Sequence, residues 1–287
     1  MSHEENSAYT YLRPTKKFPN VWCSGCGIGI VMSALIRAVD RMELDKNEVA
    51  LVSGIGCTGR MPVYLDFNTM HTTHGRALAF ATGLKIAQPN LKVIVIMGDG
   101  DAVAIGGNHF IHAARRNIDL TAIVVNNSIY GMTGGQYSPT TPIDSRATTA
   151  PYGNIEQPMA ICDLAIAAGA SFVARSTVFH AVELDRIFEQ AIRKVGFSMV
   201  ETVSYCHTTF GRINKLGTPV DMMRRIKETS VNQAVAEKLT PEERATKIVR
   251  GVLWNVEKPE YLALYDKVIQ RAQESIKPRP QEVSNVK

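Results

Sequence analysis

Four of the five cysteines are spaced as the ligands of a metal centre could be. Cys23 and Cys26 form a C-x-x-C pair (WCSGCG), Cys57 follows in SGIGCTGR, and Cys206 follows in SYCH. Four thiolates suit either Zn²⁺ or a 4Fe-4S cluster. A structural zinc site normally uses two close pairs, whereas one pair with two distant single cysteines favours the cluster. A structural zinc ion and unligated thiols remain the alternatives.

The fifth cysteine, Cys162, differs from the other four. It lies in an apolar stretch (MAICDLAIAA) and is predicted to be packed core. Five cysteines are too few for a disulfide scaffold in a chain of this length, and their odd number also argues against a simple disulfide set. Metal or redox chemistry is therefore the better hypothesis for the other four.

A second motif combines glycines with hard oxygen ligands. Gly98-Asp99-Gly100 follows the apolar residues 92–97 (KVIVIM), and Asn126-Asn127 follows residues 119–125 (DLTAIVV). Glycines let the backbone approach a phosphate closely, and the Asp99 and Asn127 side-chain oxygens suit Mg²⁺ bound to diphosphate. The carbonyl of Ile129 could complete the ligand set. Gly-Asp-Gly alone would indicate an ordinary turn, but the two motifs together at strand ends are far more specific.

The elements that must position these residues alternate between apolar runs and amphipathic stretches. The predicted strands are residues 48–53, 92–97, 119–125, 171–174 and 197–203, and the predicted helices are 74–88, 106–116, 159–168 and 180–194. Strands without polar alternation, separated by helices, indicate a parallel sheet that is covered on both faces. The fold class is therefore a doubly wound, mostly parallel α/β fold, whose ligands bind beyond the carboxyl ends of the strands.

Two segments depart from this alternation. Residues 127–158 are rich in Gly, Thr and Pro and nearly without charge, and a loop of that length in a compact domain is usually functional. The chain after about Cys206 is more polar, and residues 241–256 are predicted to be helical there.

Composition excludes several classes of protein. The chain has 287 residues, with 32 Lys and Arg against 27 Asp and Glu, a net charge of +5 and 45% hydrophobic residues. This mix excludes global disorder, and the small dispersed charge excludes the basic stripe of a nucleic-acid-binding protein. No apolar run reaches the ~18 residues of a membrane span. Because the N-terminus (MSHEENSAYT) is polar and acidic rather than a secretory signal, we expect a soluble, cytoplasmic protein.

The Gly-Asp-Gly and Asn-Asn pair resembles the thiamine diphosphate fingerprint. With the cysteine motifs, it resembles the beta subunit of the 2-oxoacid:ferredoxin oxidoreductases over roughly residues 19–217. The resemblance is carried by WCSGCGIG, SGIGCTGR, HTTHGRALAFATG, GDGDAVAIGGNHF, NNSIYGMTGGQYSPTTP and CHTTFGRINKLG. The loop containing GMTGGQYSPTTP is most similar to the 2-oxoglutarate-specific branch. Some broad-specificity relatives carry a lysine where this chain has Gly134, so that possible substrate contact is missing.

The resemblance implies three sets of ligands. Cys23, Cys26, Cys57 and Cys206 would bind one 4Fe-4S cluster, and Asp99, Asn127 and the Ile129 carbonyl would bind Mg²⁺. The residues that would contact thiamine diphosphate are Ile55, Gly56, Cys57, Thr58, His71, Thr72, Thr73, His74, Gly100, Asp101, Gly131 and Met132.

Two side chains are candidates for catalysis. A neutral His74 imidazole could bond the diphosphate or the reacting carbonyl, and His71 lies three residues before it. The simpler interpretation of both histidines is a helix start satisfied by backbone groups. Arg60 could bind a substrate carboxylate, although a surface or interface arginine is an equally good interpretation.

The family activity implied is oxidative decarboxylation of a 2-oxoacid with coenzyme A, or its reverse, with electrons passing through the cluster to ferredoxin. The resemblance implies an alpha subunit as partner, in an αβ unit that is itself doubled. The family supplies from that subunit the glutamate that activates the cofactor, and no such glutamate is placed among these motifs. Residues 1–215 are predicted to form the cofactor-binding domain, and residues 216–287 a C-terminal extension packing on that partner.

Three alternatives stay open at this stage. Another 2-oxoacid, such as pyruvate, could be the substrate. The chain could instead be a non-redox thiamine diphosphate enzyme with structural zinc at the cysteines. It could also be a non-catalytic electron-carrier or scaffold subunit.

Overall fold

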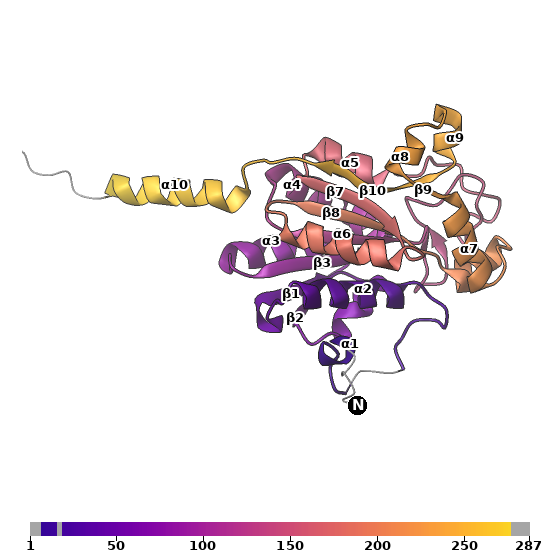
Figure 1. The fold of residues 1–287 in the computed structure, drawn as a ribbon, viewed down its shortest axis with the longest axis horizontal. Coiled ribbons are helices and arrows are strands. Elements are labelled where there is room, and N and C mark those ends of the chain that lie inside the picture. Colours follow the sequence, from indigo (N-terminus) through magenta and orange to yellow (C-terminus); the bar gives the residue numbers. More distant parts are fainter. Residues whose placement is uncertain (1–6, 16–18, 277–287) are drawn as a thin grey trace, which may run out of the picture.

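The computed structural model describes residues 7–15 and 19–276, and its centre is one eight-stranded sheet (Figure 1). The strand order is β2-β1-β3-β4-β8-β7-β10-β9. The strands are β1 (Val49–Ser53), β2 (Asn68–His71), β3 (Lys92–Gly98), β4 (Thr121–Asn126), β7 (Phe172–Thr177), β8 (Ser198–Val203), β9 (Ser230–Asn232) and β10 (Ile248–Asn255). A separate small hairpin joins β5 (Ile129–Tyr130) to β6 (Gln136–Tyr137).

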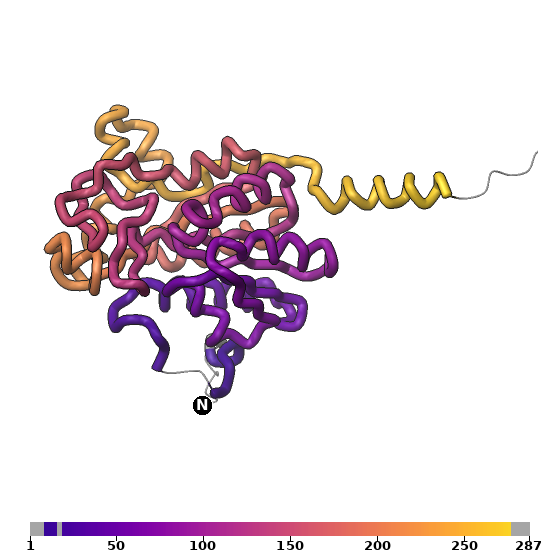
Figure 2. Tube along the Cα trace, turned by 180° about the vertical axis from the view of Figure 1, so that it is seen from behind, coloured from indigo at the N-terminus to yellow at the C-terminus, as the bar shows by residue number. Residues whose placement is uncertain are grey.

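Helices cover both faces of this sheet. The helices are α1 (Ser7–Thr10), α2 (Ile28–Arg41), α3 (Ala77–Ala87), α4 (Gly107–Arg116), α5 (Ile161–Ala168), α6 (Ala181–Arg193), α7 (Pro219–Thr229), α8 (Gln233–Ala236), α9 (Pro241–Ala245) and α10 (Tyr261–Ile276). Short 3₁₀ helices are η1 (Lys46–Glu48) and η2 (Thr58–Val63), and π-helical turns are η3 (Gly100–Ile105) and η4 (His207–Gly211). Helices α2 and α6 pack on one face (Figure 1), and α3, α4 and α5 on the other, which Figure 2 shows from behind.

The two cores are built from alternate residues of the same strands. Leu51 of β1 and Ile94 of β3 belong to the core under α2 and α6, whereas Val52 and Val95 belong to the opposite core. A strand buried on both faces needs apolar residues at every position, which is why these strands show no polar alternation. The sheet is parallel throughout except for β10, which pairs antiparallel with β7. The predicted doubly wound, mostly parallel fold is confirmed.

One predicted element is wrong. Residues 241–256 are not one helix, because α9 ends at Ala245 and β10 begins at Ile248. The β-branched and apolar residues of β10 pair with the edge of β7 that would otherwise be open. In addition, Gly251 has a φ of 122°, which is incompatible with an α-helix. Because β10 joins the main sheet, the predicted boundary at residue 215 is not a break in the sheet. Packing of residues 216–287 on a partner stays a prediction, and residues 277–287 lie outside the described part.

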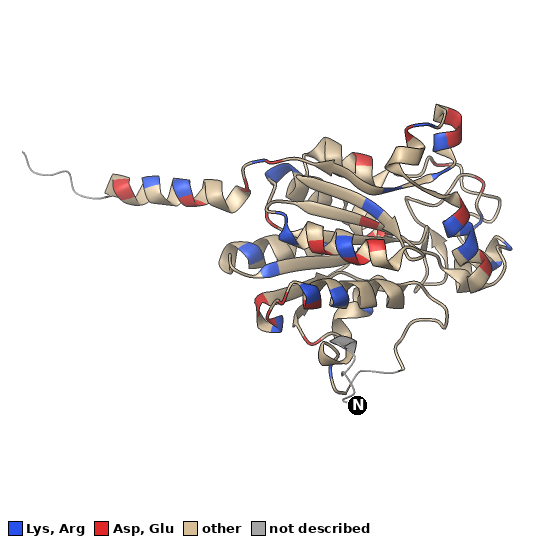
Figure 3. Ribbon diagram, in the orientation of Figure 1, with Lys and Arg blue, Asp and Glu red and all other residues tan. Residues whose placement is uncertain are grey.

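The last helix, α10, extends away from the rest of the molecule (Figure 1), and most of its residues are exposed. Along α10 and α6, acidic and basic residues are interspersed rather than sorted into faces of one sign (Figure 3). Among the described helices, none is both long and apolar enough to cross a membrane.

A buried asparagine joins α4 to three other segments at the end opposite the carboxyl edge. Asn117 ends α4 in the left-handed conformation (φ 51°), and its Oδ1 accepts hydrogen bonds from Ser171 Oγ and Phe197 N, both at 2.8 Å. Its Nδ2 donates to the Pro259 carbonyl at 3.1 Å. The side chain therefore holds α4, β7, β8 and the segment before α10 together.

We expect Asn117→Ala to lower the free energy of unfolding by about 2–4 kcal/mol. Alanine is strained in the left-handed region and leaves buried donors unpaired. Asn117→Gly is the matched control, since it removes the same bonds without the strain. Denaturant unfolding should rank wild type above glycine and glycine above alanine, and equal stability of the two variants would contradict the role of the backbone conformation.

Candidate active site

A pocket lies beyond the carboxyl ends of β1, β3 and β4, where the sequence places its two oxygen-ligand motifs. The predicted residues that line it are Ile55, Gly56, Cys57, Thr58, His74, Asp99, Gly100, Asp101, Asn127, Ile129, Gly131 and Met132. Gly98, Tyr130 and Thr133 line it as well. Strands β3 and β4 are parallel neighbours, with Gly98 opposite Val125, so Asp99 and Asn127 meet at one edge of the sheet.

Four of the residues predicted to contact the cofactor or the substrate do not line this pocket: Arg60, His71, Thr72 and Thr73. The His71 Nδ1 lies 2.9 Å from Ser53 Oγ, and Thr72 Oγ1 donates to the Ser53 carbonyl at 3.0 Å. These contacts hold the β1 and β2 ends together. Arg60 lies half-buried on η2, and its assignment to a substrate carboxylate stays a prediction.

Asp99 is a buried carboxylate supported by hydroxyl groups. Ser138 Oγ and Thr140 Oγ1 both approach its Oδ2, at 2.6 and 2.5 Å. Burial raises the pKa of Asp99, and the hydrogen bonds from Ser138 and Thr140 offset part of that rise. Because both hydroxyls engage the same oxygen, Oδ1 is the carboxylate oxygen that remains for a cation.

The turn after β4 sets the position of Asn127. Ser128 has a left-handed backbone (φ 61°), its N–H donates to Asn126 Oδ1 at 3.1 Å, and the Ile129 N–H lies 3.4 Å from Asn127 Oδ1. Such an Asx turn brings the Asn127 side-chain oxygen and the following backbone to the same side. Two of the three predicted Mg²⁺ ligands are thereby held by one turn.

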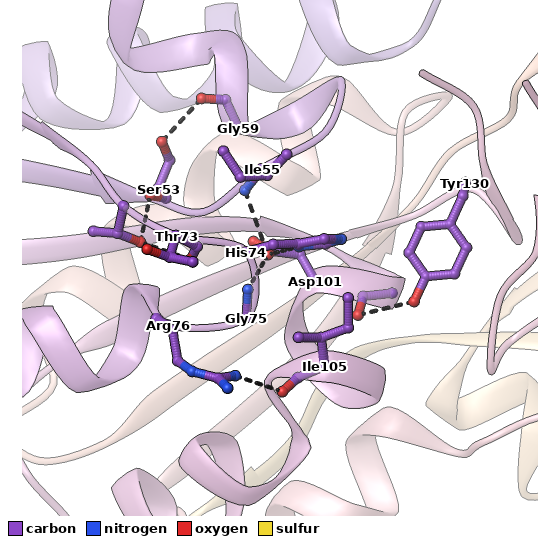
Figure 4. Close-up of polar contacts among 12 residues, drawn as sticks. Ser53, Ile55, Gly59, Thr73, His74, Gly75, Arg76, Asp101, Ile105 and Tyr130 are labelled. Atoms are coloured by element: carbon purple, nitrogen blue, oxygen red, sulfur yellow. Dashed lines mark hydrogen bonds and ion pairs between the residues drawn. The ribbon is translucent and has the colours of Figure 1, made fainter. Parts of the chain in front are cut away.

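Asp101 faces His74 rather than Asp99. Its Oδ1 contacts His74 Nδ1 and accepts from the N–H groups of Gly75 at 2.7 Å and Ile55 at 3.4 Å (Figure 4). Its Oδ2 is buried and has no hydrogen-bond partner among the described residues, and a Cβ on Gly54 would lie 2.1 Å from it. A carboxylate that accepts from Nδ1–H fixes the imidazole tautomer, so Nε2 is the nitrogen left for chemistry in the pocket.

Tyr130 is a pocket residue that sequence reasoning missed as a site residue. Its ring lies against Gly100, where a Cβ would be 2.2 Å from the ring, and its hydroxyl donates to the Gly100 carbonyl at 3.3 Å. Burial, then the charges of Asp99 and Asp101, raise the pKa of Tyr130 to about 12. The signal available was its place two residues before Met132, inside the segment already assigned to the site.

Two aromatic side chains hold the cysteine segments together. Trp22 Nε1, next to Cys23, donates to the Cys57 carbonyl at 2.8 Å. Tyr205, next to Cys206, donates its hydroxyl to the Gly25 carbonyl at 2.8 Å. The C-x-x-C loop is thus bonded to both of the segments that carry the single cysteines.

The four thiols lie beside the pocket. Cys57 lines it, and a Cβ on Gly131 would lie 3.3 Å from Cys206 Sγ and 3.8 Å from Cys57 Sγ. Cys23 Sγ and Cys206 Sγ lie 3.7 and 3.6 Å from the same hydroxyl, that of Thr208. Within the described residues, no group of three or more His, Cys, Asp or Glu side chains is arranged to hold a metal ion, so the four-cysteine ligand set stays a prediction.

Burial and mutual repulsion disfavour charged thiolates in the absence of a cation. Burial raises the pKa of Cys26 to about 11, with further contributions from Cys57, Cys206 and Cys23. Burial, Cys206 and Cys23 likewise raise the pKa of Cys57 to about 11. A cationic centre is the kind of partner that would stabilise the thiolate forms.

Cys162 is fully buried on α5, as predicted. Its thiol donates to Glu201 Oε2 at 3.2 Å, and its pKa is raised well above the ordinary value by burial and by the Glu201 charge. It lies in the core on the opposite side of the sheet from α2.

A larger cavity, of about 480 Å³, opens on the other side of Asn127, between α7 and residues 142–145. Among the residues predicted for the site, Asn127 is the one that it shares with the smaller pocket. The concentration of carboxylates, glycines and Cys57 marks the smaller pocket as the chemical site.

Comparison with known proteins agrees with this geometry. Residues 49–202 match the family "Thiamine pyrophosphate enzyme, C-terminal TPP binding domain". The fold and site are therefore those of a thiamine pyrophosphate enzyme. The chain is 50% identical over 264 residues to the 2-oxoglutarate synthase subunit KorB of Methanocaldococcus jannaschii, covering 92% of this chain and 97% of that relative.

Two further proteins are similar along most of their length. The KorB subunit of Archaeoglobus fulgidus is 57% identical over 218 residues, which are 76% of this chain and 79% of the relative. A solved 2-oxoglutarate:ferredoxin oxidoreductase from Magnetococcus marinus, with 2-oxoglutarate, coenzyme A and succinyl-CoA bound, matches with a TM-score of 0.83 and 32% identity over 94% of this chain and 92% of that one. The chain belongs to the KorB subunit family of the 2-oxoglutarate synthases.

We expect the His74 ring to carry its proton on Nδ1 because the Asp101 carboxylate accepts there. In protein labelled with ¹⁵N-histidine, Asp101→Ala should shift the His74 ring signals towards the Nε2–H tautomer, the common form of a free neutral imidazole. His71 is the internal control, since its Nδ1 contacts Ser53 instead. His74 signals that do not change in the variant would contradict the assignment.

Proposed function

We propose that this chain is the thiamine diphosphate-binding beta subunit of a 2-oxoglutarate:ferredoxin oxidoreductase of the cytoplasm. The enzyme would decarboxylate 2-oxoglutarate with coenzyme A, or run in reverse, and exchange electrons with ferredoxin through a 4Fe-4S cluster. One observation carries the proposal: Asp99, Asn127 and Cys57 line the same pocket at the carboxyl edge of the sheet. A cofactor held by the first two would lie beside the thiols.

The residues present fit Mg²⁺ and a diphosphate. Asp99 Oδ1, the Asn127 side-chain oxygen and the Ile129 carbonyl are hard ligands, and a divalent cation would offset the cost of burying Asp99. Gly100 and Gly131 line the pocket, and their backbone N–H groups are donors of the kind that bind phosphate oxygens. When bound, thiamine diphosphate supplies the nucleophilic carbon and the electron sink for decarboxylation.

The residues of this chain would then bind and exchange protons. His74, held by Asp101 with Nε2 exposed to the pocket, can accept or donate a proton at the reacting carbonyl. Ile55 and Met132 line the same pocket with apolar side chains that are 38% and 45% exposed in this chain, so a partner subunit packed over them would exclude water. Excluding water protects a reaction that must lose electrons rather than gain a proton.

We assign the four thiols beside the pocket to a 4Fe-4S cluster. Their segments are bonded together through Trp22 and Tyr205, and Cys57 belongs to both the thiol group and the pocket wall. A cluster there would be within short range of the cofactor, which is what stepwise electron removal requires.

The enclosed part of the pocket, about 80 Å³, is far smaller than the ~300–1,000 Å³ of typical ligand sites. This chain would therefore contact one end of the cofactor, and a surface of another chain is needed to enclose the rest. The acidic residues that line the pocket are Asp99 and Asp101, both engaged as described, so the activating glutamate is assigned to an alpha subunit. This supports an αβ unit as the active form.

We expect serine at Cys23, Cys26, Cys57 or Cys206 to remove the brown chromophore and most of the iron from anaerobically purified complex. Oxygen is a poorer ligand than a thiolate sulfur for iron of this kind. Cys162→Ser is the matched control, because this thiol is packed in the core and should leave iron content unchanged. Equal iron loss in that variant, or zinc in place of iron, would contradict the assignment.

We expect the isolated chain to show no coenzyme A-dependent reduction of ferredoxin or viologen, and the partner chain to restore it with 2-oxoglutarate. His74→Gln should lower kcat in the restored complex by about 10²–10⁴-fold, the range for a lost acid–base group. His71→Gln, outside the pocket, is the control. Robust turnover by the single chain would refute the shared site, and a preference for pyruvate would move the substrate assignment to that oxoacid.

A further inference from the structure

A buried ion pair joins the neighbouring strands β7 and β8 close to their carboxyl ends. Arg175 on β7 and Glu201 on β8 are register partners, and Arg175 Nε donates to Glu201 Oε2 at 2.7 Å. Each is the one charged residue of its strand, in FVARST of β7 and SMVETV of β8, and Figure 3 shows the central strands mostly in tan. Burial alone would raise the pKa of Glu201, but the Arg175 charge and the bonds from Asn126, Arg175 and Cys162 hold it below its ordinary value.

The second oxygen of Glu201 determines how Asn126 is oriented. Asn126 Nδ2 donates to Glu201 Oε1 at 2.8 Å, so its Oδ1 must point the other way. That Oδ1 accepts from the Ser128 N–H at 3.1 Å and lies 2.9 Å from Thr140 Oγ1. A carboxylate can only accept, so Glu201 excludes the flipped amide.

Each contact of Asn126 Oδ1 leads to a proposed Mg²⁺ ligand. Thr140 Oγ1 is also 2.5 Å from Asp99 Oδ2, and its single proton is shared between the Asp99 and Asn126 oxygens. The Ser128 N–H bond closes the turn that presents Asn127. One amide thus connects Glu201 to both metal-binding side chains.

We propose that Glu201, bonded to Arg175, is a positioning residue that orients Asp99 and Asn127 for magnesium diphosphate through Asn126 and Thr140. This inference rests on the proposed function of the site. Without an acceptor at Glu201 Oε1, the Asn126 amide is free to rotate. Thr140 and the Ser128 N–H then lose the Asn126 Oδ1 acceptor that they share. Mutating a residue that supports metal ligands in this way typically weakens the metal affinity about 10–100-fold.

The test is a calorimetric titration of Mg²⁺ into the complex with the partner subunit, at saturating thiamine diphosphate. Glu201→Gln keeps the shape, but its single oxygen can serve Arg175 or Asn126 and not both. Its control is Cys162→Ala, which removes a different bond to the same carboxylate. Thr140→Val removes the hydroxyl, and Thr140→Ser restores it. Thr121→Val, on β4, controls for losing a buried hydroxyl elsewhere in the chain.

We expect Glu201→Gln and Thr140→Val to weaken the apparent Mg²⁺ affinity about tenfold or more, while Thr140→Ser, Cys162→Ala and Thr121→Val stay within about twofold of wild type. Folded Glu201→Gln with wild-type Mg²⁺ affinity would overturn the inference and leave the proposed function standing. If Glu201→Gln does not fold, Asn126→Ala, which interrupts the same path at a less buried residue, decides in the same way. A wild-type complex without Mg²⁺-dependent cofactor binding would overturn the proposed function itself.

Discussion

The parallel pairing of β3 with β4 is the constraint on which the rest of the site depends. Both strands run in the same direction with Gly98 opposite Val125, so the residues that follow them must leave the sheet at the same edge. Asp99 and Asn127 are therefore neighbours although many residues separate them in the chain. The pairing is itself stabilised by two cores, because alternate residues of each strand are buried under opposite layers of helices. The packing of the apolar strands β3 and β4 thus determines where Asp99 and Asn127 lie.

The same edge concentrates charge that folding alone would not favour. Asp99 and Asp101 are 3% and 2% exposed, and an unpaired buried carboxylate is costly. Different hydrogen-bond partners offset the cost of burial at the two carboxylates. Hydroxyls of the long loop surround one oxygen of Asp99, and an imidazole and two backbone N–H groups surround one oxygen of Asp101. Asp99 is left with an oxygen suited to a cation, and Asp101 holds a histidine. Two similar carboxylates thereby acquire different roles.

The sequence was sufficient where chemistry follows directly from strand ends, and insufficient where it depends on register. Asp99 and Asn127 could be placed together because each follows a recognisable buried strand. Glu201 could not be connected to Asn126, since that contact requires knowing that β4 and β8 are neighbours and which residues face each other. Thr140 lies in a loop whose path no periodicity predicts. Residues 241–256 were assigned to a helix because their pattern is locally helical, yet the open edge of β7 made a strand more favourable.

The proposed cofactor and cluster share one structural element, and this limits how independent they can be. The turn after β1 contributes Ile55, Gly56 and Thr58 to the pocket, and Cys57 between them belongs to the thiol group. Trp22 bonds the Cys57 carbonyl, so the N-terminal C-x-x-C segment supports the same turn from outside. A Cβ added to Gly131, in the segment after β4, would lie within 3.8 Å of the sulfur atoms of both Cys57 and Cys206. A shift of the proposed cluster would therefore move residues that line the cofactor pocket, and a shift of the cofactor would move the segment that carries Cys57. The short path proposed for electron transfer would thus be the same feature that couples the positions of the two sites.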